Sequence, residues 1–265
     1  MLTVSALYIY PIKSLGGIAL TEAAVSDRGF LNDRRWMLID EQNRFISQRE
    51  QPQLALFRVQ LEKDGLMINH PDAGNLSVPF HQAGKTAITV SVWDDTCDAL
   101  LAEQHAHKWF SEALGINCRL VYMPDTTLRP VDQRYAPEGR ITSFSDAYPF
   151  LLIGQASLDD MNNRLDAPVP MNRFRPNIVF SGGSPYQEDQ LKSFRIGDVG
   201  FRGVKPCARC TVTTVDQQTG LKGKEPLKTL ARYRTVNKKI MFGQNLIHEG
   251  TGVIRVGDPL IPCED

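Results

Sequence analysis

The segment Lys205-Pro206-Cys207-Ala208-Arg209-Cys210 holds the residues of this chain that are best suited to chemistry. Cys207 stands between two basic residues, and a nearby positive charge favours the thiolate, which is both a nucleophile and a metal ligand. The next residues, 211–216, are rich in Thr and Val and predict a β-strand. The role of the Cys207 sulfur is therefore the first question that this sequence raises.

Four interpretations of Cys207 and Cys210 are open at this point. A thioredoxin-like C-x-x-C redox pair normally has a helix directly after its first Cys, whereas a Thr/Val run follows here. A structural zinc site needs four Cys or His ligands, and Cys97, Cys118 and Cys263 have no partner at ligand spacing. The third interpretation is a pair of small, half-buried thiols at a strand edge. The fourth is a single soft ligand to a metal that a cofactor brings.

Basic residues recur where the chain is expected to turn. Lys13 and Ser14 follow a predicted strand in a Gly-rich loop, through which backbone can approach an anion closely. Arg34 lies at the start of another strand. The residue before a proline is pushed to extended geometry, so Arg173 and Arg175, which precede Pro176, are predicted to share a face and to suit a phosphate. Solvated surface side chains are the alternative at each position.

Composition and missing motifs exclude several classes of protein. The 265 residues include 30 Lys and Arg and 30 Asp and Glu, so the basic excess of a nucleic-acid-binding protein is absent. No apolar run approaches ~20 residues, which predicts no membrane span. The sequence has no Walker A, Rossmann or G-x-S-x-G motif, so the standard nucleotide-binding and α/β-hydrolase functions have no support. Five sparse cysteines and no secretion signal predict a cytoplasmic protein.

Apolar patterning predicts a mainly β protein with a few helices (α+β). The expected strands are residues 4–10, 36–40, 54–62, 66–68, 89–93 and 118–123, and the expected helices are residues 98–114, 155–165 and 225–233. Asp64-Gly65 predicts a hairpin turn. Several short strands at close spacing predict a barrel or sandwich over residues 1–95, followed by a helix and linker over 96–123. The polar, Pro-rich segment 124–149 is expected to be a long loop.

Several short segments, taken in order, form one pattern. They are Tyr10-Pro11-Ile12-Lys13-Ser14, Asp33-Arg34-Arg35-Trp36, Ser145-Asp146-Ala147-Tyr148-Pro149-Phe150, Phe174-Arg175-Pro176-Asn177-Ile178, Lys205-Pro206-Cys207-Ala208-Arg209-Cys210, Thr213-Thr214-Val215-Asp216, Phe242-Gly243-Gln244-Asn245 and Val256-Gly257-Asp258-Pro259. This pattern resembles the MOSC family, named for the C-terminal domain of molybdenum cofactor sulfurase, and within it the branch of the mitochondrial amidoxime-reducing component and its bacterial relatives. The resemblance implies an N-terminal β-barrel-like domain packed on a MOSC β-barrel core over residues 124–265.

The resemblance also implies roles for individual residues. It implies that Cys207 binds molybdenum and that Cys210 is not the ligand. Residues implied to contact or line the site of the molybdenum–molybdopterin cofactor are Lys13, Ser14, Arg34, Ser145, Asp146, Arg173 and Arg175. Asp216 or Asn177, both close to family motifs in the sequence, are candidates for orienting substrate or protons.

The implied activity is reduction of small N-hydroxylated compounds: hydroxylamines, amidoximes or N-hydroxylated bases. The sequence has no C-x₄-C-x₂-C spacing, so no Fe–S cluster is expected in this chain. Electrons are then expected from a separate protein, such as a ferredoxin, a flavodoxin or a cytochrome b5 type reductase. Two alternatives are a sulfur carrier that uses a Cys207 persulfide and a non-catalytic molybdopterin carrier.

Overall fold

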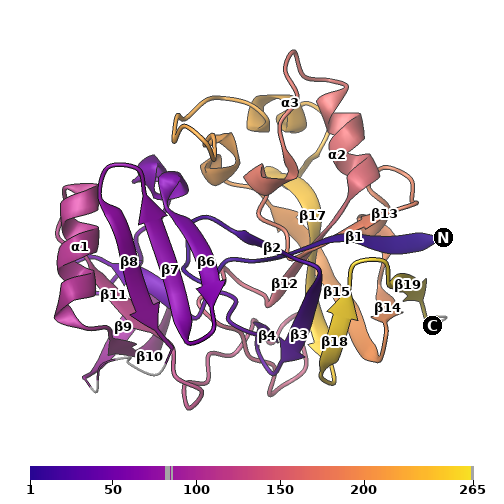
Figure 1. Cartoon of the computed structure of the whole chain (residues 1–265). Coiled ribbons are helices and arrows are strands. Elements are labelled where there is room, and N and C mark those ends of the chain that lie inside the picture. The colour runs from indigo at the N-terminus through magenta and orange to yellow at the C-terminus, as the bar shows by residue number, and fades with distance from the viewer. Residues whose placement is uncertain (81–83, 85, 264–265) are drawn as a thin grey trace.

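The computed structural model describes residues 1–80, 84 and 86–263, and these residues form a mainly β protein, as predicted. Two halves are visible in Figure 1, with a barrel on the right and two smaller sheets on the left. A lobe of helices and loops lies above the barrel. No helix within the described part of the chain has both the length and the apolar character to cross a membrane.

A closed seven-stranded β-barrel forms the larger half. In order around the barrel its strands are β12 (Phe150–Gly154), β13 (Ile178–Ser181), β1 (Leu2–Ile9), β19 (Pro259–Pro262), β14 (Ser193–Ile196), β15 (Val199–Ala208) and β17 (Lys239–Glu249), and β17 pairs with β12 to close it. Side chains alternate across each strand, so Val4, Phe180 and Phe201 point into a shared apolar core. Closure gives each of the seven barrel strands a partner on both sides.

The strands of the first thirty residues pair with the barrel and with the C-terminal part of the chain, which the sequence did not predict. β1 pairs with β13 and β19, and the short β2 (Ile18–Leu20) pairs with β1. β3 (Glu22–Ser26) lies between β4 (Gly29–Phe30) and β18 (Gly252–Arg255). Such long-range pairing leaves no local trace in the apolar pattern, which explains why the sequence did not predict it. The predicted domain boundaries at residues 95 and 124 stay predictions.

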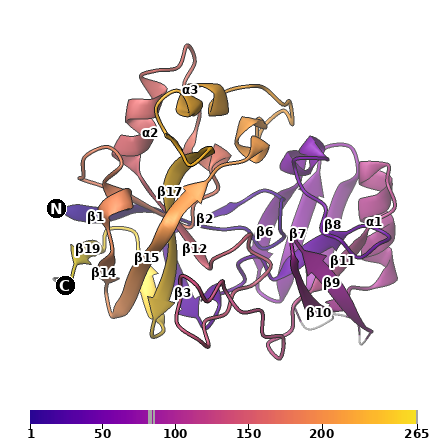
Figure 2. The same cartoon turned by 180° about the vertical axis from the view of Figure 1, so that it is seen from behind.

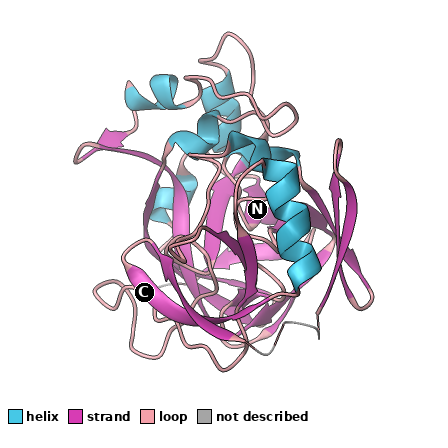
Figure 3. Ribbon diagram, turned by 90° about the vertical axis from the view of Figure 1, so that its left-hand side faces the viewer, coloured by secondary structure: helices cyan, strands magenta, loops and turns pink. Residues whose placement is uncertain are grey.

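The smaller half contains two antiparallel sheets and one helix. One sheet has the order β5 (Trp36–Ile39), β11 (Arg119–Tyr122), β10 (Asp95–Leu101), β9 (Ala87–Val92), and the other has the order β6 (Arg58–Glu62), β7 (Gly65–His70), β8 (Gly74–Pro79). The Asp64-Gly65 turn joins β6 to β7, which confirms the predicted hairpin. The helix α1 (Gln104–Leu114) packs over the strands through Phe110, as Figure 3 shows from that side.

Three predicted elements differ from the structure. The predicted helix starts at residue 104 rather than 98 because the preceding residues pair with β9 as β10, although it ends at Gly115 in left-handed geometry, as expected. Residues 54–56 belong to the 3-10 helix η1 (Pro52–Leu56). The Thr/Val run after Cys210 is the 3-10 helix η4 (Thr211–Thr214), not a strand. The hydroxyls of its last two threonines donate to backbone carbonyls three residues earlier, and such bonds compete with strand pairing.

The remaining elements cover the upper side of the barrel. They are α2 (Gln155–Asn162), η2 (Met171–Arg173), η3 (Gln187–Gln190), α3 (Leu227–Ala231) and β16 (Thr235–Val236). β16 forms a hairpin with the start of β17. Both α2 and α3 begin and end within about three residues of the predicted helices, a margin that is usual for helix ends.

Buried arginines hold the long segment between β11 and β12 in place, and Figure 2 shows this segment running between the two halves. Arg129 is 2% exposed, and its Nη1 donates to the carbonyls of Ser143 and Ser145 at 2.9 and 2.6 Å. Its Nη2 contacts the Asp95 carboxylate at 2.7 Å. Arg28 likewise donates to three carbonyls between residues 124 and 127. The guanidinium groups satisfy carbonyls that the loop leaves without sheet partners.

Replacement of Arg129 by Met is expected to lower the free energy of unfolding by about 2–5 kcal/mol, because two buried carbonyls lose their donor. The exposed Arg134, which pairs with Asp132, provides the matched control. Arg134→Met is expected to leave the free energy of unfolding nearly unchanged, since exposed ion pairs contribute little. Urea unfolding of both variants measures the difference. Equal losses would show that Arg129 does not secure this loop.

Candidate active site

A cavity of about 590 Å³ lies between the barrel and the smaller half, and residues from both line it. Eight of the ten predicted site residues are on its wall: Lys13, Ser14, Arg34, Ser145, Asp146, Arg175, Asn177 and Cys207. They come from segments as far apart in sequence as residues 13 and 207. The fold therefore brings most of the predicted set to one place. The two residues that it leaves outside are Arg173 and Asp216.

Lys13 presents a buried ammonium group to one side of the cavity. Its Nζ donates to the carbonyl of Phe144 and to Oδ1 of Asp146, both at 2.7 Å. Burial lowers the pKa of Lys13 to about 8, while the attraction of Asp146 acts in the opposite direction. Burial would also raise the pKa of Asp146, but the attraction of Lys13 outweighs it and holds that pKa well below its usual range. At neutral pH both groups are therefore charged.

Two arginines sandwich the ring of Tyr10. The guanidinium carbon of Arg34 lies 4.5 Å from the ring centroid and that of Arg175 lies 4.2 Å from it. A side chain at Gly17 would overlap this ring, because its Cβ would lie 2.4 Å from a ring carbon. The hydroxyl of Tyr10 donates to the carbonyl of Pro176 at 3.1 Å, and burial raises its pKa, so the ring stays neutral. Tyr10 thus fixes two cations that would otherwise repel each other.

Arg34 and Arg175 differ in how far they are neutralised. Arg34 donates to the Asp33 carboxylate at 2.6 Å and to Oδ1 of Asn177 at 3.0 Å. Arg175 donates through Nη1 to the carbonyl of Leu15 at 2.7 Å, and its buried Nη2 has no hydrogen-bond partner among the described residues. Burial lowers the pKa of Arg175 to about 10, which still leaves it protonated at neutral pH. Arg175 is therefore a cation on the cavity wall with one buried donor that no described residue satisfies.

Three of these residues have a left-handed backbone. The φ angles of Ser14, Arg34 and Arg175 are 70°, 49° and 55°. This conformation is uncommon for residues other than Gly, Asn and Asp, and strain of this kind costs of order 1–3 kcal/mol per residue and gathers at functional sites. The strain marks this wall of the cavity as a surface that serves more than packing.

The Cys207 thiol lines the same cavity, near the end of β15. Its Sγ is half-buried and accepts a hydrogen bond from Nη1 of Arg209 at 3.1 Å. Nη2 of the same guanidinium donates to the carbonyl of Phe174 at 2.6 Å, which holds it in place. In the described part of the chain, no group of three or more His, Cys, Asp or Glu residues could hold a metal ion, so Cys207 is not part of a multi-residue metal site of that kind.

The structure separates the two arginines that the sequence placed on one face. Arg173 ends η2 and forms an ion pair with Asp216 at 2.8 Å, whereas Arg175 turns into the cavity. A left-handed residue at 175, rather than the extended one expected before proline, produces this divergence. The other carboxylate oxygen of Asp216 accepts bonds from backbone N–H groups of the turn that follows. Asp216 and Arg173 thus have structural partners outside the cavity.

Asn177 lies on the cavity wall but uses its side chain within the protein. Its Oδ1 accepts from Arg34 and from the backbone N–H of Leu151, and its Nδ2 donates to the carbonyl of Tyr8 at 3.2 Å. These bonds leave little of the amide for a substrate, since an amide can make about four. Asn177 therefore positions Arg34.

The smaller half adds residues that the sequence did not single out. The Arg49 guanidinium lies 4.1 Å from the ring centroid of Trp93, and the indole N–H of Trp93 donates to Asp146 at 3.1 Å. Both residues also line a neighbouring hollow of about 650 Å³. Trp93 has a left-handed backbone (φ 58°) in the turn between β9 and β10. A Trp in a turn could have indicated a functional residue, but nothing in the sequence predicts that Trp93 contacts Asp146.

Comparison with known proteins finds two domain families in this chain. Residues 1–117 match the MOSC N-terminal beta barrel domain, and residues 139–261 match the MOSC domain. The chain is 36% identical to mitochondrial amidoxime-reducing component 1 of Mus musculus, over 97% of this chain and 81% of that protein, and 34% identical to its namesake in Homo sapiens, over 97% and 82%. It is also 33% identical to molybdenum cofactor sulfurase of Oryza sativa subsp. japonica, over 92% of this chain and 32% of that protein.

Proposed function

This chain belongs to the MOSC family, and we propose that it is a molybdenum-dependent oxidoreductase that reduces N-hydroxylated compounds. The observation that carries the proposal is the Cys207 thiol, held against Arg209 in the same cavity as an arginine with a free donor. Two relatives that match nearly the whole chain are named as amidoxime-reducing components, which supports the substrate class.

The residues of the cavity fit a molybdenum–pterin cofactor. A thiolate is a soft donor that suits molybdenum, and Cys207 supplies a sulfur on the cavity wall. A phosphate needs cations and N–H donors, which Arg175, Arg34 and Lys13 would provide. The unpartnered Nη2 of Arg175 supports this assignment, because a buried donor without an acceptor is costly unless a ligand satisfies it.

When bound, the cofactor supplies a metal that can exchange electrons and accept oxygen from an N–O bond. The protein's own part is to hold and orient. Arg209 donates a hydrogen bond to the Cys207 sulfur and so fixes its position, and Asn177 and Asp33 hold Arg34 toward the cavity. Arg49 and Trp93 form a flat wall for a planar substrate. The net reaction consumes two electrons and two protons and yields the amine-type compound and water, with electrons from a separate carrier protein.

Purified protein from a host that makes the cofactor tests this proposal. We expect about one molybdenum and one pterin per chain, and dithionite-driven reduction of benzamidoxime or N-methylhydroxylamine to the amine-type product. Bound cofactor without turnover would favour a molybdopterin carrier. The relative named molybdenum cofactor sulfurase supports a sulfur-carrier alternative. If cyanide releases sulfur from Cys207 and the protein contains no molybdenum, the sulfur-carrier function would replace the proposed reductase function.

Cofactor binding is expected to weaken at alkaline pH because Lys13 loses its charge. Its pKa of about 8 means that the ammonium is present below this pH and absent well above it. If the bound anion keeps Lys13 protonated, affinity falls by up to about tenfold for each pH unit above 8. Equilibrium dialysis with pterin fluorescence measures the retained cofactor. Lys13→Met should bind weakly throughout and lose this dependence, and an unchanged wild-type affinity about one unit above pH 8 would contradict the prediction.

A further inference from the structure

Positive charge gathers in one segment of this electrically balanced chain. Residues 221–239 contain seven Lys and Arg residues and a single acidic residue, Glu225, although the whole chain has zero formal net charge. The segment comprises the end of the loop after η4, α3 and the β16–β17 hairpin. An uneven charge distribution of this kind creates a local positive electrostatic field, even though the net charge of the whole chain is zero.

Most of these cations face solvent without a carboxylate partner. Lys224, Lys228, Arg232, Lys238 and Lys239 are exposed, and no ion pair joins any of them to a carboxylate within the described residues. Arg234, which is the partly buried cation of this segment, differs from these five residues because it forms an ion pair with Asp189. The carboxylate of Glu225 accepts from the backbone N–H of Thr229 in α3. We call the five exposed residues the basic rim.

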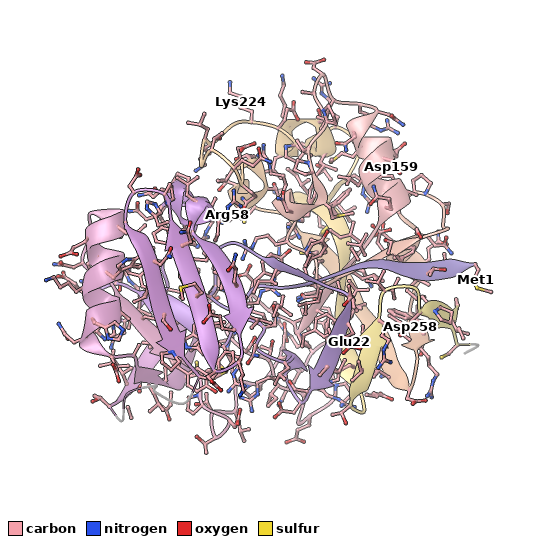
Figure 4. All side chains as sticks on the ribbon, in the orientation of Figure 1. Met1, Glu22, Arg58, Asp159, Lys224 and Asp258 are labelled. Carbon is pink, nitrogen blue, oxygen red and sulfur yellow. The ribbon has the colours of Figure 1, made fainter. Side chains whose placement is uncertain are left out.

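One end of the basic rim reaches the cavity that contains Cys207. Lys239, which belongs to the rim, and Asn237 line that cavity together with Arg49 and Trp93. Figure 4 shows Lys224 reaching outward at the top of the lobe, on the side nearer the smaller half. The labelled carboxylate of α2, Asp159, lies on the other side of the lobe. The rim therefore connects with the cavity at Lys239, and its Lys224 lies on the side of the lobe away from Asp159.

We propose that the basic rim is the docking surface for the acidic face of a one-electron carrier protein. The inference rests on the proposed function, in which electrons come from a separate carrier protein. A field of one sign steers an oppositely charged protein to its site and aligns it there. Docking on the rim would place the carrier's redox centre near the cavity mouth. A small N-hydroxylated substrate, by contrast, has no use for five surface cations spread over three elements.

The test compares two electron sources for the same loaded enzyme. One source is dithionite, which needs no docking. The other is a reduced acidic [2Fe–2S] ferredoxin, a flavodoxin or cytochrome b5, each supplied by its own reductase. The variant reverses three rim residues that do not line the cavity: Lys224→Glu, Lys228→Glu and Lys238→Glu. The control reverses three exposed cations elsewhere, Lys63→Glu, Lys108→Glu and Arg195→Glu, so that net charge changes equally.

We expect kcat/KM for the carrier to fall by at least about tenfold in the rim variant at low ionic strength, and the wild-type value to fall as salt is added. The control variant should keep carrier-driven turnover, and both variants should keep wild-type dithionite-driven turnover and thermal stability. A Lys→Gln version of the rim variant should fall between wild type and reversal. This graded response would not follow from misfolding.

The failure of this inference is distinguishable from failure of the proposed function. If dithionite drives no reduction in the wild type, the proposed function fails. Dithionite-driven turnover with an equal loss of carrier-driven kcat/KM in the rim and control variants would contradict the docking proposal. The proposal also fails if dithionite works but none of the three carriers reduces the wild type. Binding of the wild type to vesicles that contain anionic phospholipid, with carrier-driven turnover unaffected by reversal, would assign the rim to a lipid surface instead.

Discussion

Cys207→Ser is expected to remove molybdenum from the protein and to lower dithionite-driven turnover by more than about 100-fold, because residues that only support a metal ligand already account for 10–100-fold. Serine has the shape of cysteine, but its hydroxyl stays protonated at neutral pH and is a hard donor. Arg209 could donate to this hydroxyl as it does to the Cys207 sulfur, but that contact would not turn oxygen into a soft ligand. Since Cys207 is half-buried near a strand end, the fold should survive the change.

Cys210→Ser is the matched control for this prediction. Cys210 is exposed, lines the same cavity and is three residues away, so it experiences the same purification and the same oxidants. We expect this variant to keep molybdenum and turnover. Elemental analysis, pterin content and thermal unfolding of the two variants separate ligand loss from damage to the fold. If Cys210→Ser loses the metal and Cys207→Ser keeps it, the ligand assignment is reversed.

The sequence predicts local elements of this fold better than their partners. The β6–β7 hairpin followed from Asp64-Gly65, and the end of α1 followed from Gly115, because each depends on a few neighbouring residues. The placement of β1 between β13 and β19 depends on residues more than 170 positions away. Nothing in the pattern of Leu2–Ile9 distinguishes a barrel strand from a strand of the smaller half. Long-range pairing is therefore where the sequence-based reasoning stops.

The candidate site shows the same division. Lys13 and Cys207 stand out by residue type and neighbours, and both line the cavity. The contact between Trp93 and Asp146 joins a hairpin turn to a distant loop, and no sequence motif predicts it. The local rule for residues before proline even predicted the wrong geometry for Arg175, because tertiary contacts with Tyr10 and Leu15 hold it in a left-handed conformation. Chemistry could be predicted from residue types, but geometry required the fold.

Arg175→Met is expected to weaken cofactor binding by about 2–5 kcal/mol, or more than about thirtyfold in Kd, because a buried charged partner of an anion is removed. The free Nη2 of Arg175 makes it the strongest candidate for a direct contact with the cofactor's phosphate. Arg34 is partly neutralised by Asp33, so its loss should cost less. Titration of cofactor-free protein with molybdopterin measures the affinity. Arg175→Lys should restore part of it, since charge returns without the bidentate fork.

Arg173→Met provides the internal comparison, because the two arginines differ in direction rather than in type. Arg173 pairs with Asp216 outside the cavity, so its loss should reduce stability and leave cofactor affinity unchanged. The stability of each variant is measured without cofactor, which separates binding from folding. Equal effects of the two substitutions on affinity would mean that the anion does not lie against Arg175. The left-handed turn at residue 175 would then be a consequence of packing on Tyr10 rather than a device that aims a guanidinium group at a ligand.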